Sequence, residues 1–375
     1  MAKKLNAVKQ FRRRHAQLVK TEARIAAALE RQKKKILQKK NVIGFGVSQR
    51  AGRYVAVFFV TRKVKTGKLL PKDRLPRSIT VGGKRFPTDV RTIQRPSTTA
   101  GDPIGDPTEN RRSYHYNGKG DWKMGVGISI FKPQPPGAPK WVNAGTAGAR
   151  VVSKKDPNEH LVLTCGHVVK AAGLEVAQQL DDRDPPPGSL FNFVGQVKQV
   201  SADFGDADAG TIECVGALQE ILPIGKPRPL VFPYVGMFVQ KSSWTTGLTW
   251  SQISETNVTC ISNLTTYTGL FSAKNYCMQD PSAPGKLKAG VPVDKFSFGG
   301  DSGALIVLGK PNQPGVWGDP GLQRMYDQAD AAEKVKIRDE WERAALGLNC
   351  LASDDWAYGQ IIIRALAAMK VHLEL

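Results

Sequence analysis

The segment that most constrains this chain is a glycine-rich turn that leads into an apolar strand, residues 298–307. It reads Phe-Gly-Gly-Asp-Ser-Gly-Ala-Leu-Ile-Val, so that Asp301 and Ser302 lie among three glycines. Adjacent glycines allow consecutive backbone N–H groups to point at one spot, and the last glycine leaves space beside the hydroxyl. This pattern predicts a nucleophilic serine next to a nest that can hold an oxyanion. The alternative is an ordinary glycine turn before a strand.

Two further polar positions lie next to apolar runs upstream. His167 follows a β-type run, and Asp206 and Asp208 precede another one. Histidine is the usual general base for a serine nucleophile, and a carboxylate can fix the imidazole tautomer. Each residue alone has a simpler explanation, a buried core histidine or a solvated turn. Together they make His167, Asp208 and Ser302 a candidate set, with Asp206 as the alternate acid because residues two apart share one face of a strand.

The Thr-x-x-His ending, the Asp-Ala strand start and the Gly-Asp-Ser-Gly turn, in this order, resemble the chymotrypsin/trypsin-like serine peptidases. The similarity covers roughly residues 140–375. Residues 239–253 resemble the hairpin that opens the second barrel in bacterial, non-secreted members, although Ser243 and Ser251 stand where glycines are usual. The resemblance implies a mainly β, chymotrypsin-like fold of two six-stranded barrels, the first ending near residue 220.

The same resemblance implies hydrolysis of peptide bonds in a protein or peptide substrate by a His-Asp-Ser triad. Ser302 would attack the carbonyl, His167 would transfer the proton, and Asp208 would orient the imidazole. The N–H groups of Gly300 and Ser302 would form the oxyanion hole. Phe296, six residues before the nucleophile, would line the substrate pocket and favour apolar or small side chains over Lys or Arg. This chemistry is complete without a metal or a cofactor.

Length and local composition divide the 375 residues into four parts. Residues 1–40 are predicted to form a basic amphipathic helix. Residues 41–95 begin with a predicted hairpin and resemble the small α/β module that often precedes the peptidase in bacterial relatives. Residues 96–122 are rich in Pro and hydroxyl side chains and are interpreted as a linker. Residues 123–375 would form the peptidase domain. Its residues 309–346 form an insertion that departs from the compact family plan, and residues 322–346 of it are predicted to be a helix.

The N-terminal helix combines a narrow apolar seam with high positive charge. Residues 1–40 hold 14 Lys and Arg and 2 acids, so +12 of the chain's net charge of +21 lies there. Such a helix either docks on its own protein or binds an anionic partner, whether a nucleic acid, a membrane surface or an acidic protein. Six of the nine seam positions, at alternating steps of three and four, are apolar: Val8, Phe11, Leu18, Ile25, Leu29 and Ile36.

The five cysteines are scattered, odd in number and free of CxxC spacing, so we expect reduced thiols. No apolar run reaches the about 18 residues of a membrane span, and none follows the first residues as in a signal peptide. These features favour a cytoplasmic protein. Together with the family resemblance they lead us to expect a site-specific and regulated serine endopeptidase, and relatives of this type point to stress or defence. Two alternatives stay open: a catalytically silent peptidase-fold binding protein, and a binder of anionic partners through residues 1–40.

Overall fold

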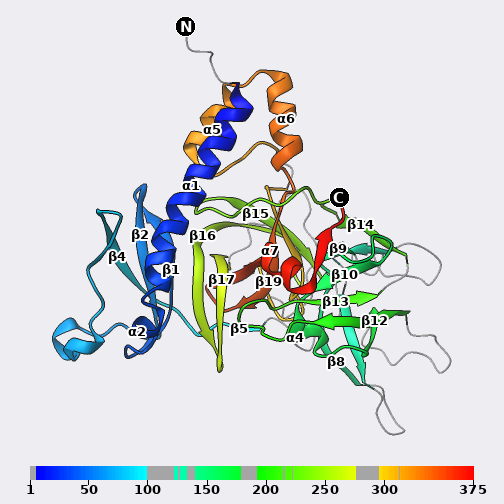
Figure 1. Cartoon of the computed structure of the whole chain (residues 1–375), viewed down its shortest axis with the longest axis horizontal. Coiled ribbons are helices and arrows are strands. Elements are labelled where there is room, and N and C mark those ends of the chain that lie inside the picture. Colours follow the sequence, from blue (N-terminus) through cyan, green and yellow to red (C-terminus); the bar gives the residue numbers. More distant parts are fainter. Residues whose placement is uncertain are drawn as a thin grey trace.

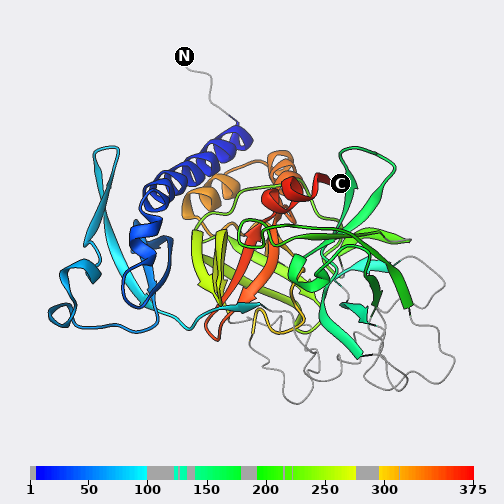
Figure 2. The ribbon, with the colours of Figure 1, turned by 60° about the horizontal axis from the view of Figure 1, so that its bottom comes forward.

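The computed structural model describes residues 6–98, 122–125, 127–132, 140–178, 192–213, 216–221, 223–275, 295–311 and 313–375. Two large sheets make up most of it, and the helices of eight or more residues lie along one side (Figures 1 and 2). The predicted linker lies almost entirely outside the described residues. Among the described residues, none of the helices combines the length and apolar composition that crossing a bilayer requires.

The helices are α1 (Ala7–Glu30), α2 (Lys33–Leu37), α4 (Gly166–Val169), α5 (Pro320–Asp327), α6 (Ala331–Trp341) and α7 (Ile362–Met369), with two 3₁₀ turns at Thr66–Lys68 and Pro71–Asp73. The strands of the larger sheet are β1 (Val42–Arg50), β2 (Arg53–Val60), β3 (Ser78–Val81), β4 (Lys84–Thr92), β5 (Ser97–Thr98), β15 (Phe238–Ser243), β16 (Gly247–Ser262), β17 (Thr265–Lys274), β18 (Leu305–Leu308), β19 (Ala345–Ala352) and β20 (Trp356–Ile361). The strands of the smaller sheet are β7 (Gly127–Lys132), β8 (Lys140–Thr146), β9 (Ala149–Ser153), β10 (His160–Thr164), β11 (Glu175–Gln178), β12 (Asn192–Val200), β13 (Gly210–Glu213) and β21 (Val371–Leu373). A separate parallel pair consists of β6 (Trp122–Met124) and β14 (Ala217–Ile221).

Six strands of the larger sheet close into a ring. The path β15-β18-β19-β20-β17-β16 returns to its start because β15 also pairs with β16. The strand β16 is 16 residues long, and its second half pairs with β1, so the sheet continues outward through β1, β2, β4 and β3. Residues 41–95 therefore share a sheet with the C-terminal strands, and their boundary as a separate module stays a prediction.

The smaller sheet is an open path, β21-β9-β10-β13-β12-β11-β7-β8, among the described residues. Its first strand comes from the C-terminus, which crosses back after α7 to pair with β9. The mainly β class expected from the sequence is confirmed, but two barrels of six strands each are not. The difference lies in the smaller sheet, which is an open path of eight strands among the described residues rather than a closed barrel of six.

The N-terminal helix docks on the protein through its predicted seam. All six predicted apolar positions are buried, and so are the polar seam members His15 and Glu22, whereas Gln32 is exposed. The helix ends at Glu30 and restarts as α2, so residues 1–40 do not form one helix. Phe11 packs edge-on against Trp317 and Trp341, with ring centroids 5.0 and 5.1 Å away, which ties α1 to the C-terminal insertion.

The expected single helix over residues 322–346 is wrong in extent. The segment forms α5 and α6, and β19 already begins at Ala345. Asp330 explains the break, because its side chain accepts a hydrogen bond from the Glu333 N–H and caps a new helix. Asp319 caps α5 in the same way through the Leu322 N–H.

Candidate active site

His167 lies in the short helix α4, directly after the buried strand β10. The strand ends at Thr164, and the histidine lies three residues beyond it. The chain turns closely at Gly166, where a Cβ atom would lie 2.7 Å from the Phe204 ring and 2.8 Å from the Ala209 carbonyl oxygen. A side chain at position 166 would therefore push the helix, and the imidazole with it, away from the neighbouring loop.

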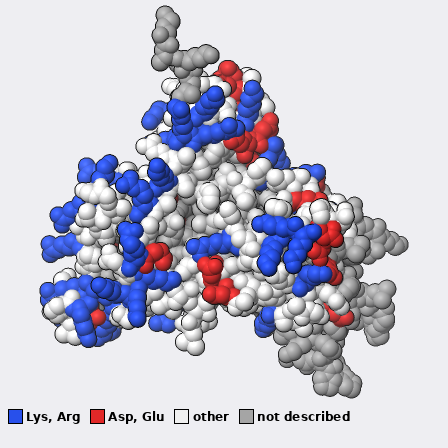
Figure 3. Space-filling view, in the orientation of Figure 1, with Lys and Arg blue, Asp and Glu red and all other residues white. Residues whose placement is uncertain are grey.

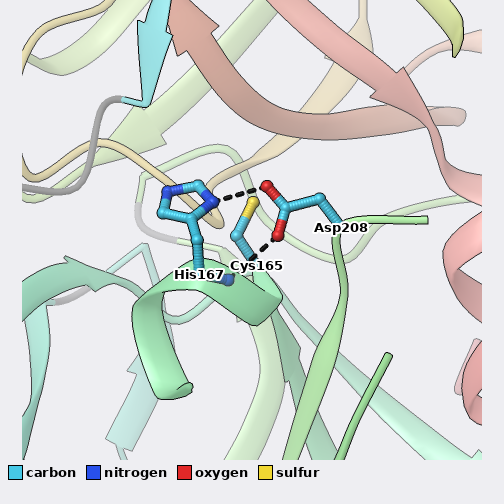
Figure 4. Close-up of side chains that lie close together, drawn as sticks. All are labelled: Cys165, His167 and Asp208. Carbon is cyan, nitrogen blue, oxygen red and sulfur yellow. Dashed lines mark hydrogen bonds and ion pairs between the residues drawn. The ribbon is translucent and has the colours of Figure 1, made fainter. Parts of the chain in front are cut away.

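Asp208 holds His167 through two hydrogen bonds. Its Oδ1 accepts the backbone N–H of His167 at 2.9 Å, and its Oδ2 lies 2.5 Å from Nδ1 (Figure 4). Gln360 of β20 holds the backbone of the acid in place, since its Oε1 accepts the Asp208 N–H at 2.8 Å. The alternate acid Asp206 does not face the imidazole, because it is exposed and pairs with Arg364 at 2.7 Å.

Ser302 completes a continuous chain of hydrogen bonds. Its Oγ lies 2.8 Å from Nε2 of His167, so the imidazole is bonded through both ring nitrogens. The structure thus brings together the three residues that lie 41 and 94 positions apart in the sequence. Ser302 and Asp208 are fully buried, whereas the His167 side chain is 10% exposed.

Two glycines around Ser302 adopt backbone angles that other residues rarely reach. Gly300 has φ +91° and Gly303 has φ +94°. Space is also closed at both positions: a Cβ atom would lie 2.4 Å from Thr245 Oγ1 at the first and 2.1 Å from Thr164 Oγ1 at the second. The turn that presents Ser302 therefore requires glycine at both positions.

Asp301 organises this turn from the inside. Its Oδ1 accepts the N–H groups of Thr245 and Thr246 at 3.0 and 3.1 Å, and its Oδ2 accepts the Phe298 N–H at 3.0 Å. The ammonium group of Lys241 lies 3.1 Å from the same Oδ2, with both side chains fully buried. A buried carboxylate is tolerated only with such a partner, so Lys241 supplies the charge that lets Asp301 hold the loop.

Thr245 orients the peptide group before Gly300. Its Oγ1 donates a hydrogen bond to the Gly299 carbonyl oxygen at 2.5 Å. In a trans peptide the C=O and the following N–H point in opposite directions. The Gly300 N–H therefore points away from Thr245, the orientation that a donor to an oxyanion on the other side of the turn requires.

Phe296 is not brought to an open surface. Its side chain is fully buried, and the Lys241 ammonium group lies 5.2 Å from its ring centroid. Its carbonyl oxygen accepts a hydrogen bond from Thr249 Oγ1 at 3.1 Å. Residues 276–294, which immediately precede this segment, lie outside the described residues. A preference for apolar or small substrate side chains stays a prediction.

A cysteine beside the imidazole raises the question of a metal. Ligand atoms of Cys165, His167 and Asp208 lie within 4.8 Å of one another (Figure 4). Metal binding requires a thiolate, but burial raises the pKa of the Cys165 thiol well above its ordinary value. The thiol also donates to the Asn349 carbonyl oxygen, and both imidazole nitrogens already have partners. This donor set fits proton transfer better than metal binding.

Several residues that support the site were not assigned a role from the sequence. They act across long separations: Lys241 and Asp301 are 60 residues apart, and Gln360 is 152 residues from Asp208. The Lys-Ser-Ser-Trp-Thr-Thr stretch of residues 241–246 was visible as part of the hairpin pattern. A lysine inside a predicted hairpin strand, followed by two threonines, is the sequence signal that could have pointed to a partner for Asp301.

Solved structures similar to this chain are chymotrypsin-like serine proteases. They include protease A of Thermobifida fusca (16% identity, TM-score 0.40, covering 67% of this chain and 96% of that one). Two others are a glutamic acid-specific serine protease that uses a histidine triad in substrate binding (17%, 0.39, 67% and 100%) and the chymotrypsin of Cellulomonas bogoriensis (15%, 0.39, 68% and 98%). No protein-family model matches the chain, and neither does any curated protein. At these TM-scores the similarity supports no argument about the reaction, which depends on the geometry of the site.

Proposed function

We propose that this chain is a serine endopeptidase with Ser302 as nucleophile, His167 as general base and acid, and Asp208 as the residue that orients the imidazole. The observation that carries the proposal is the unbroken hydrogen-bond chain from Ser302 Oγ through both His167 nitrogens to Asp208. A serine hydroxyl is a weak nucleophile unless a base accepts its proton, and this arrangement provides that base at 2.8 Å.

The proposed reaction has two acyl-transfer steps. Ser302 Oγ attacks the carbonyl carbon while Nε2 of His167 takes the hydroxyl proton, and Nδ1–H remains bonded to Asp208. His167 then gives the proton to the leaving amine, which breaks the peptide bond and leaves an acyl-serine. A water molecule, deprotonated by the same imidazole, hydrolyses the acyl-serine and restores the hydroxyl.

The proposed oxyanion hole consists of the N–H groups of Gly300 and Ser302. The Thr245 bond to the Gly299 carbonyl and the Lys241–Asp301 pair support it, because both hold the turn before substrate arrives. A single donor of this kind typically contributes roughly 3 kcal/mol to transition-state stabilisation. Loss of preorganisation would therefore reduce the rate even with the three reacting side chains intact.

Regulation is part of the proposal because the nucleophile is covered. Ser302 has no exposed surface, and only a small part of the His167 side chain is exposed. A peptide carbonyl has to come within about 3 Å of Ser302 Oγ to react, so the buried serine must first become accessible. We infer that a partner or a specific substrate triggers this opening, which fits cleavage of selected proteins rather than general digestion.

The proposed compartment is the cytoplasm. Among the described residues, Cys165, Cys260 and Cys350 are buried and free. Unpaired thiols are typical of a reducing compartment. The substrate class, peptide bonds, follows from the motif resemblance of residues 140–375, since the hydrogen-bond chain alone would serve other acyl transfers equally well.

The test is digestion of a proteome-derived peptide library, with new N-termini identified by mass spectrometry. We expect termini that form with the native chain and are absent with Ser302→Ala, located after small or apolar residues. Cleavage mainly after Lys or Arg would contradict the pocket assignment alone. Identical termini with both proteins, or none with the native chain under any condition, would favour the catalytically silent binding protein.

A further inference from the structure

The net positive charge of this chain is confined to its first quarter. Residues 1–95 hold 27 of the 54 Lys and Arg but only 4 of the 33 Asp and Glu, a formal charge of +23. The remaining 280 residues carry −2. The candidate active site therefore lies in a nearly neutral region, and the basic region is separate from it in the sequence.

The structure spreads these cations over an outer surface. Of the Lys and Arg in residues 6–95, 21 are exposed, and among the described residues Arg12 is the one member of this exposed set in an ion pair, with Glu340. The four acids offer little compensation: Glu22 is buried, and Glu30, Asp73 and Asp89 accept hydrogen bonds from neighbouring groups. Figure 3 shows blue side chains over α1, with red ones beside them, and over the region of β1–β4, where few red ones appear.

The segment between β2 and β3, residues 61–77, holds a third of the exposed Lys and Arg of this surface, and we call it the basic arm. It carries seven Lys and Arg, all exposed, and one acid, Asp73. Figures 1 and 2 show the arm at the end of the molecule opposite the smaller sheet. The arm is thus accessible to a large partner while the ring of strands stays uncovered.

The contacts of α1 argue against a membrane surface as the partner. A basic helix binds a bilayer by burying its apolar face among the lipids. Here that face packs against α5, α6 and strands of the larger sheet. Leu70 is the one large apolar side chain among residues 6–98 that is strongly exposed, at 60%. Charge alone remains for binding, and it is arranged over several elements rather than on one helix face.

The aromatic residues of the region distinguish between kinds of nucleic acid. Single-stranded chains bind by stacking their bases on exposed aromatic side chains. In residues 6–95 every Phe and Tyr is buried or half-buried. A duplex needs no stacking platform, because its phosphates are reached by Lys and Arg alone.

We propose that residues 6–95 form a sequence-independent binding surface for the phosphate backbone of double-stranded nucleic acid, with the basic arm as its principal contact. This surface does not depend on the proposed hydrolysis. It would concentrate the catalytic region along a duplex, so that proteins bound to the same nucleic acid become its neighbours.

The experiment is fluorescence anisotropy with a labelled 25-base-pair DNA duplex of mixed sequence and the full chain, at NaCl concentrations from 50 to 200 mM. We expect the affinity to fall by about 10³-fold over this range, as for roughly six phosphate contacts. A quadruple variant, Lys63→Gln, Lys65→Gln, Lys68→Gln and Lys72→Gln, should bind at least about tenfold more weakly and lower the salt slope by about 1 for each lost contact.

The matched control carries the same charge change on exposed lysines outside residues 6–95: Lys155→Gln, Lys226→Gln, Lys274→Gln and Lys336→Gln. It should bind like the native chain. Equal losses in both variants, or an affinity of the native chain that does not change with salt, would overturn the proposal. So would tighter binding to phosphatidylserine vesicles, to polyglutamate or to the single strand than to the duplex at the same salt. Hydrolytic activity does not enter this readout.

Discussion

The imidazole of His167 has a hydrogen bond on each ring nitrogen, and the two bonds have different consequences. In the mechanism we propose, the bond to Ser302 activates the serine, and the bond to Asp208 decides which nitrogen holds the proton. Asp208 also accepts the backbone N–H of His167, so the same carboxylate positions the ring and its helix. Replacing the acid should therefore affect the rate far more than substrate binding.

The Asp208→Asn variant tests this role. The amide can donate to Nδ1, which would leave the proton on Nε2 and block it from accepting the Ser302 proton. We expect kcat to fall by about 10⁴-fold with little change in KM. Asp206→Asn is the control, because this acid is exposed and pairs with Arg364; its kcat should stay within about twofold. Equal effects of the two changes would contradict the assignment.

Lys241 should be needed for the loop even though it contacts no reacting atom. Lys241→Met removes the ammonium group from beside the buried Asp301 carboxylate, which we expect to lower the free energy of unfolding by about 3–5 kcal/mol. Adding Asp301→Asn removes that charge and should recover much of the stability, as thermal denaturation can measure. Activity should not recover, since the amide of Asn cannot replace both carboxylate oxygens as acceptors. Recovery of both would show that the ion pair only stabilises the fold.

At the scale of elements, α1 is fixed to the larger sheet partly through a buried acid. Glu22 accepts hydrogen bonds from the Val235 N–H at 3.1 Å and from Thr256 Oγ1 at 2.6 Å. Burial raises the pKa of Glu22 to about 7 from its ordinary value of 4.5. The folded protein therefore binds this proton more tightly than the unfolded chain, and α1 docking should weaken as the carboxyl ionises.

Glu22→Gln should change how stability depends on pH. Between pH 4.5 and about 7 the folded state retains a proton that the unfolded state releases, so the Glu22 contribution falls as pH rises, by up to about 3 kcal/mol. Glutamine imitates the protonated acid and removes this term. Melting temperatures at pH 5 and pH 8 should differ less for the variant than for the native chain. The same difference in both would show that Glu22 does not titrate as expected.

At the scale of the whole molecule, local patterns in the sequence predicted single helices and site residues better than they predicted how the strands assemble into sheets. The seam of α1 was readable because it recurs with helical spacing, and His167, Asp208 and Ser302 stood out beside apolar runs. The open second sheet, the extension of the larger sheet through β1–β4 and the Lys241–Asp301 pair could not be predicted from local patterns, because each joins segments many residues apart. The break between α5 and α6 was a missed cap at Asp330 rather than a long-range effect.

The same scale relates the site to the rest of the chain. Ser302 lies in the loop before β18, His167 in the helix after β10, and Asp208 in the loop before β13. Both sheets therefore position residues of the site. Their alignment depends on how the two sheets pack, and a change in that packing would separate the reacting atoms.

Labelling with a fluorophosphonate probe tests the central claim most directly, because the probe reacts only with an activated serine and requires no known substrate. Once a partner or substrate has opened the site, intact-mass and peptide mass spectrometry should find one adduct per chain, on Ser302. The adduct should be absent in Ser302→Ala and should form far more slowly in Asp208→Asn. An adduct on another residue that persists in Ser302→Ala, or no adduct on the native chain with or without duplex DNA and candidate substrates, would contradict an assembled catalytic serine.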